Sequence, residues 1–132
     1  MVFKTIGNKS NPVILFFHAM GVIGESSMPV AEKMKEKYYC IMPTSTVYCP
    51  GQRYQSKRDE IQKIVRFLEN HGIKEIELAV ASSIGADLAM AYSTVLQTEG
   101  GYNASAFMRI KIAEHASYFL SYSPAYRMYQ TG

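Results

Sequence analysis

One turn decides the fold of this chain: Val80-Ala81-Ser82-Ser83-Ile84-Gly85-Ala86. It joins an apolar run to a stretch of helical period. A serine on a sharp strand-to-helix turn needs small residues two positions before it and two after it. Larger side chains there would collide with the strained backbone and with neighbouring strands. Ser83 meets this requirement, because Ala81 and Gly85 occupy those positions. We therefore expect the Ser83 hydroxyl above the carboxyl edge of a sheet, where ligands bind in open α/β folds.

Apolar runs and stretches of helical period alternate along the first 97 residues. Such alternation predicts a three-layer α/β sandwich with a mostly parallel sheet. Two of the runs are almost continuously apolar, as expected for strands that are covered on both faces. The connection over residues 43–55 is expected to be irregular, because it contains a Pro-Gly turn signal. The predicted strands are Val2–Ile6, Val13–Phe17, Tyr38–Met42 and Ile76–Ala81, and the predicted helices are Met28–Lys37, Ser56–Asn70 and Ile84–Gln97.

The length of 132 residues fits one domain. Residues 1–97 carry the clear alternation, and residues 98–132 form a tail whose pattern supports two interpretations. The tail fits a strand over Phe107–Ile112 followed by a helix over Ala113–Tyr122, which we favour, and it also fits one long helix.

Composition excludes several classes of protein. The chain is 48% apolar with 14 basic and 11 acidic residues, so it is no disordered charged tail. Because the net charge of +3 is spread along the sequence, we expect neither nucleic acid nor membrane as a partner. The longest apolar run, Val13–Phe17, is far shorter than a membrane span. The first residues lack the pattern of a signal peptide, so a cytoplasmic location is expected. The cysteines, Cys40 and Cys49, match neither a disulfide scaffold nor a zinc motif.

A second turn follows the predicted strand Val13–Phe17 and reads His18-Ala19-Met20-Gly21. Such a turn can present a backbone N–H beside a nucleophile, and the Ile84 N–H at the helix start can provide another. This turn and the Ser83 turn, in this order, resemble the α/β-hydrolase family.

The resemblance implies that Ser83 is the nucleophile. It also implies that the N–H groups of Met20 and Ile84 form an oxyanion hole, with Ala19 as the runner-up to Met20. His18 would then belong to the oxyanion turn and would not be the catalytic base.

A serine hydrolase also needs a histidine base and a carboxylate that orients it. In this family both follow the nucleophile in the chain. His115 is the only histidine after Ser83, so it is the candidate base. Its sequence neighbour Glu114 points elsewhere on a helix or a strand, and Asp87 lies one helical turn after Ser83, on the wrong element. Only 49 residues follow Ser83, enough for roughly one further strand and one further helix.

The expected function is that of an esterase-like serine hydrolase acting on a small acyl substrate such as a carboxylic ester. No metal or organic cofactor is implied. Three accounts fit the missing part of the family pattern. The chain is a truncated form of a longer hydrolase, or a homodimer completes its sheet edge, or it is an inactive form. The alternative function is a non-catalytic module that binds a small molecule or a protein on the same scaffold. A nucleotide-binding domain is disfavoured, because no glycine-rich phosphate motif is present.

Overall fold

The computed structural model describes residues 1–98 of the chain. The strand and helix predicted within residues 107–122 lie outside the described residues, as does His115. The elements, in chain order, are β1 (Val2–Ile6), β2 (Val13–Phe17), the short 3-10 helix η1 (Gly24–Ser27), α1 (Met28–Met34), β3 (Tyr39–Thr44), the 3-10 helix η2 (Thr46–Tyr48), α2 (Lys57–Asn70), β4 (Leu78–Ala81) and α3 (Ile84–Thr98).

The four described strands form one mixed sheet in the order β1-β3-β2-β4. Strand β1 runs antiparallel to β3, whereas β2 is parallel to both β3 and β4. The register pairs Phe17 at the end of β2 with Ala81 at the end of β4. The turns that follow these two strands therefore leave the sheet side by side, at its carboxyl edge.

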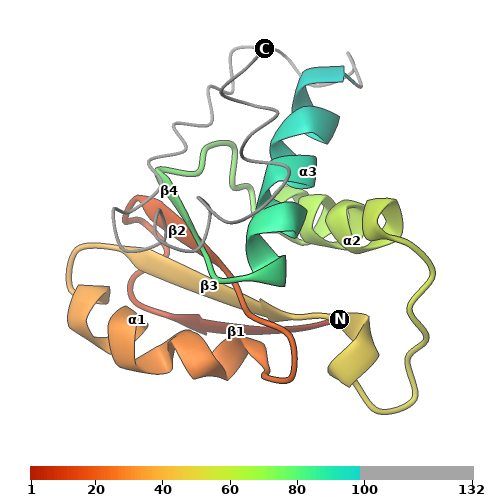
Figure 1. The fold of residues 1–132 in the computed structure, drawn as a ribbon. Coiled ribbons are helices and arrows are strands. Elements are labelled where there is room, and N and C mark those ends of the chain that lie inside the picture. Colours follow the sequence, from red (N-terminus) through yellow and green to blue (C-terminus); the bar gives the residue numbers. More distant parts are fainter. Residues whose placement is uncertain (99–132) are drawn as a thin grey trace, which may run out of the picture.

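Helices cover both faces of the sheet, which makes three layers (Figure 1). Successive side chains of β2 point to opposite faces, and all five of its residues are buried. Leu15 packs in the core under α2 and α3, whereas Ile14 and Phe16 pack in the core that includes Ala31 of α1. The three-layer α/β fold predicted from the alternation is confirmed, as is the coverage of β2 on both faces.

Strand β3 differs from its predicted bounds, because it extends through Pro43 to Thr44. The connection predicted over residues 43–55 therefore begins later, and it contains η2. Proline lacks the N–H that a central strand needs. However, the pairing of β3 with β2 covers only Tyr39 to Ile41, and Pro43 pairs with β1 alone. Pro43 thus lies where β3 has become an edge, and the missing donor costs no ladder bond on the β2 side.

Two other boundaries differ by more than one residue. Helix α1 ends at Met34, before the predicted end at Lys37, and β4 begins at Leu78, after the predicted start at Ile76. Helix α2 begins as the capping pattern predicts, because the Ser56 hydroxyl accepts a hydrogen bond of 3.1 Å from the Asp59 N–H.

We expect the stability of the fold to fall at high pH through Tyr92 of α3. This side chain is buried beside Phe17, with ring centroids 6.0 Å apart, and its burial raises the pKa of the hydroxyl. The unfolded chain therefore loses this proton first as the pH passes about 10, and the free energy of unfolding decreases. Tyr92→Phe removes this contribution, which is at most about 1.4 kcal/mol per pH unit. Urea midpoints of both proteins across this range test the prediction, and parallel pH curves would contradict it.

Candidate functional site

The turn between β4 and α3 holds Ser83 in a strained conformation. Its φ of +52° makes it the only non-glycine residue with a positive φ in the described part of the chain. Such backbone costs roughly 1–3 kcal/mol for a residue with a side chain, and it persists only where the surroundings enforce it. Hydrogen bonds on both sides of Ser83 do so: the Ser82 N–H donates to the Phe17 carbonyl at 3.1 Å, and the Ala86 N–H donates to the Ser83 carbonyl at 2.9 Å.

Gly85 brings the start of α3 against the end of β2. A Cβ atom added to Gly85 would collide with the carbonyl oxygen of Phe17 and would lie 2.6 Å from that of His18. The small residue predicted two positions after Ser83 is therefore required by a close approach of two backbones. This approach places the Ser83 turn directly beside the turn that begins at His18.

The turn after β2 is held by its own histidine. The Ser45 N–H donates a 3.0 Å hydrogen bond to His18 Nε2, and His18 Nδ1 lies 2.8 Å from the Ala19 carbonyl oxygen. The ring is buried and meets Tyr48 edge-on, with centroids 5.6 Å apart. Both ring nitrogens of His18 thus face a hydrogen-bonding partner, one within the turn and one in the segment after β3.

Tyr48 of η2 holds the far end of the same turn. Its hydroxyl oxygen accepts a 2.7 Å hydrogen bond from the Gly21 N–H. Gly21 has a φ of +80°, a conformation that glycine adopts at low cost. The segment from residue 18 to residue 21 is therefore fixed at both ends by residues that follow β3.

A cavity of about 330 Å³ opens between these turns and the start of α2. Met20 and Ile84, whose N–H groups were predicted to bind an oxyanion, both line it. Their side chains are 67% and 48% exposed, so the cavity is open on their side. Ser83 is exposed on the same turn as Ile84 and stands next to the lining without being part of it. The apolar lining residues are Met1, Phe17, Ala19, Met20, Pro43, Val47, Ile64, Ile84, Gly85 and Leu88.

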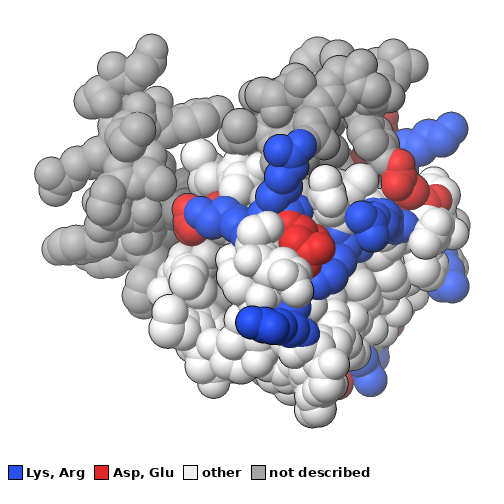
Figure 2. Space-filling model, turned by 90° about the vertical axis from the view of Figure 1, so that its right-hand side faces the viewer, with Lys and Arg blue, Asp and Glu red and all other residues white. Residues whose placement is uncertain are grey.

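Two charged residues of the lining neutralise one another. Lys57 lies at the start of α2, and its Nζ is 2.5 Å from Oδ2 of Asp87 in the first turn of α3. This ion pair joins the two helices that cover one face of the sheet. Asp87, whose position after Ser83 argues against a role as the triad acid, thus forms an ion pair with Lys57. Figure 2 shows both Lys and Arg and Asp and Glu side chains on one face of the molecule.

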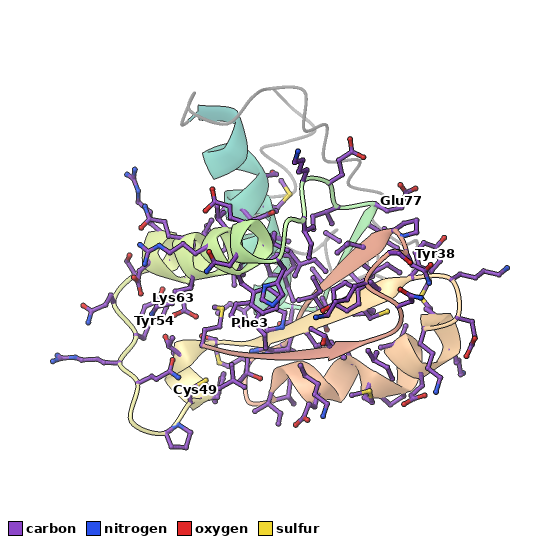
Figure 3. The ribbon with its side chains drawn as sticks, turned by 180° about the vertical axis from the view of Figure 1, so that it is seen from behind. Phe3, Tyr38, Cys49, Tyr54, Lys63 and Glu77 are labelled. Carbon is purple, nitrogen blue, oxygen red and sulfur yellow. The ribbon has the colours of Figure 1, made fainter. Side chains whose placement is uncertain are left out.

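Three residues of the site were missed by the sequence analysis: Ser45, Tyr48 and Glu60. Ser45 and Tyr48 lie on the connection that leads from β3 to α2, with Tyr48 in η2, and Glu60 lies on α2. Figure 3 shows this connection, with Cys49 and Tyr54 on it and Lys63 on α2. One signal was available in the sequence: Glu60 is a charged residue one helical turn before Ile64, on the apolar stripe of its helix.

Of the described histidines, His71 caps the C-terminus of α2, with Nδ1 2.7 Å from the Phe67 carbonyl oxygen. Cys40 and Cys49 are both buried and free, and burial raises the pKa of the Cys40 thiol, as expected for a core cysteine. The predicted base, His115, lies outside the described residues. Within those residues, no helix combines the length and the apolarity that a membrane span requires.

Comparison with solved structures identifies the fold. One similar structure is that of a protein from Desulfitobacterium hafniense that has been assigned to the alpha/beta hydrolase family. Its TM-score is 0.66, with 18% identity over 70% of this chain and 38% of that one. An epoxide hydrolase of the alpha/beta hydrolases superfamily, from metagenomes of hot environments, has a TM-score of 0.63 and 18% identity over 73% of this chain and 34% of its own. The thioesterase domain from the curacin biosynthetic pathway has a TM-score of 0.63 and 21% identity over 74% of this chain and 36% of its own.

The chain thus has the α/β-hydrolase fold, and it spans little more than a third of the length of these structures. At 18% to 21% identity the likeness establishes the fold. No family model matches the sequence, and no curated protein matches it either.

We expect Ser83→Gly to be more stable than Ser83→Ala. Both variants lack the hydroxyl, but only glycine adopts the observed φ of +52° without strain. The difference in free energy of unfolding should be about 1 kcal/mol or more in favour of glycine. Urea titration measures it, and equal stabilities would show that residue 83 is unstrained in the folded chain.

Gly85→Ala should destabilise the fold by roughly 1–3 kcal/mol, because the added methyl group meets two carbonyl oxygens that belong to backbone and cannot rotate away. Ser82→Ala is the matched control, since residue 82 is exposed on the same turn. Thermal unfolding of the three proteins checks this. A Gly85→Ala variant as stable as the control would refute the close approach of α3 to β2.

Proposed function

We propose that the chain is a serine hydrolase of the α/β-hydrolase type, acting on a carboxylic ester or a related acyl compound. One observation carries the proposal. A serine with left-handed backbone stands at a strand-to-helix turn, directly beside a second turn and an apolar cavity. Strain of this kind is stored at functional sites more often than elsewhere.

The reaction follows from the two turns. The Ser83 hydroxyl oxygen would attack the acyl carbon, and a base would take its proton. The negative charge on the carbonyl oxygen would be stabilised by the N–H groups of Met20 and Ile84. The C–O bond to the alcohol then breaks, and the alcohol leaves with the proton held by the base. Water would attack the acyl-serine in the same way, releasing the acid and restoring Ser83.

The first donor of α3 is available for this role. The N–H groups of Gly85 and Ala86 already donate within the turn, to the carbonyls of Ser82 and Ser83 at 2.9 Å each. Among the described residues, no acceptor contacts the Ile84 N–H, as expected for the first residue of a helix. Its position at the positive end of the helix favours a developing anion.

The names of the similar structures bear on the class of substrate. Their names include a thioesterase domain and an epoxide hydrolase, so the fold accommodates more than one electrophile. Serine at the turn favours acyl transfer, because a hydroxyl attacking an ester forms a covalent acyl intermediate. The base is proposed to be His115. In both other histidines, His18 and His71, Nδ1 is hydrogen-bonded to a backbone carbonyl oxygen. Nε2 of His18 also accepts a hydrogen bond.

A fluorophosphonate probe tests the proposal. We expect wild-type protein to be labelled, Ser83→Ala to lose all labelling, and the neighbouring control Ser82→Ala to keep it. Hydrolysis of p-nitrophenyl butyrate should follow the same pattern. His115→Ala should lower the labelling rate by about 100-fold or more, the usual contribution of a general base.

Absence of labelling in wild-type protein at any probe concentration would contradict the proposal and leave the non-catalytic binding module. Labelling that survives in Ser83→Ala would place the nucleophile elsewhere. Labelling that depends on Ser83 but not on His115 would show that another group supplies the base.

A further inference from the structure

We propose that Glu60 is a positioning residue, which aims the Met20 N–H at the reacting carbonyl through Ser45 and His18. The inference rests on the proposed function, because it concerns the oxyanion hole of the same site. It adds a role for a buried acidic group that the reaction itself does not use.

Glu60 is 1% exposed, on the face of α2 that looks toward the end of β3. Burial of a carboxylate is costly unless its oxygens are satisfied. Oε2 accepts hydrogen bonds from the Ser45 hydroxyl at 2.8 Å and from the Thr46 N–H at 3.0 Å, and Oε1 accepts one from the Thr46 hydroxyl. Three donors from one short segment thus converge on one side chain, which acts only as an acceptor.

Lys63 completes the surroundings of Glu60 on the same helix. Its ammonium lies 3.7 Å from Glu60 Oε1 and 2.6 Å from Asp59 Oδ2. The hydrogen bond to Asp59 raises the pKa of Lys63, so the cation is retained at neutral pH. The hydrogen bonds of Glu60 thus come from Ser45 and Thr46, and these bonds hold that segment against α2.

Ser45 links Glu60 to His18 through two hydrogen bonds. While the Ser45 hydroxyl is bound to Glu60, its backbone N–H donates to His18 Nε2 at 3.0 Å. A nitrogen that accepts a hydrogen bond carries no proton, so in the neutral ring the proton must be on Nδ1. Nδ1 faces the Ala19 carbonyl oxygen at 2.8 Å and donates to it. Glu60 and Ser45 thereby select one tautomer of His18.

The orientation of the Met20 N–H follows from that bond. The described chain contains no cis peptide, and in a trans peptide the C=O and the N–H point in opposite directions. Because the Ala19 carbonyl is turned toward the imidazole, the Met20 N–H of the same peptide points away from it. The next donor, the Gly21 N–H, is already bound to Tyr48. The Met20 N–H is therefore the donor that this turn can offer to an oxyanion. This favours Met20 over Ala19, because no such hydrogen bond determines the orientation of the Ala19 N–H.

The test measures the His18 ring and the reaction separately. Multiple-bond ¹⁵N NMR spectra distinguish the two neutral tautomers of histidine, and the chain has three histidines to assign. We expect wild-type His18 as the Nδ1–H tautomer, and a mixture of tautomers in Glu60→Ala and in Ser45→Ala. Glu69→Gln is the control, since Glu69 is exposed on the same helix, and it should leave the spectrum unchanged.

In the reaction with p-nitrophenyl butyrate, we expect Glu60→Ala to lower kcat about tenfold and to change KM less than twofold. Complete loss of one oxyanion donor costs about 100-fold to 1,000-fold, and a misaimed donor costs less. Glu60→Gln keeps the length and one acceptor oxygen, so it should recover part of kcat. The double variant with Ser45→Ala should be no slower than the slower single variant, because both changes break one relay.

Two results would overturn the proposal. One is a folded Glu60→Ala variant with the wild-type His18 tautomer, and the other is additive effects of the Glu60 and Ser45 changes on kcat. If Glu60→Ala does not fold, Ser45→Ala alone decides, since it removes only one hydroxyl. If wild-type protein hydrolyses nothing, the proposed function fails. The NMR spectra then still decide whether Glu60 and Ser45 control His18, and an unchanged tautomer would reject the relay.

Discussion

The contact between the first turn of α3 and the end of β2 is the constraint on which the site depends. Gly85 lies so close to the carbonyl groups of Phe17 and His18 that no side chain fits there. This approach leaves little room for the link from β4 to α3. The link consists of Ser82 and Ser83, and Ser83 adopts a left-handed backbone. The same contact brings the Ser83 turn beside the turn that starts at His18. Strain in one turn and proximity of the other thus have a common cause.

The two turns are stabilised in different ways. The Ser83 turn is held by backbone hydrogen bonds, one to the end of β2 and two between the turn and the start of α3. The His18 turn depends on polar side chains, because Ser45, Tyr48 and the buried Glu60 connect it to the segment after β3. A buried network is rigid when all its members are bonded, and it fails when one member is lost. We therefore expect loss of one of these polar side chains to affect the His18 turn first.

Much of the fold could be predicted from local sequence. The continuous apolar character of Val13–Phe17 indicated a strand covered on both faces, and the spacing of small residues around Ser83 indicated the sharp turn. Local pattern was wrong at Pro43, where the end of pairing with β2 removes the usual objection to proline in a strand. It also missed the relay of Glu60, Ser45 and His18. These hydrogen bonds join residues 15 and 27 positions apart, and no periodicity reports such a contact. The role of His115 stays a prediction.

The central claim is that the two turns together bind an oxyanion. A crystal structure of the protein after reaction with a fluorophosphonate tests it most directly, because the phosphonyl oxygen occupies the position of that oxyanion. We expect phosphorus bonded to Ser83 Oγ, with the phosphonyl oxygen about 2.7–3.1 Å from the backbone nitrogens of both Met20 and Ile84. An adduct whose phosphonyl oxygen contacts neither nitrogen, or an adduct on any other residue, would contradict it.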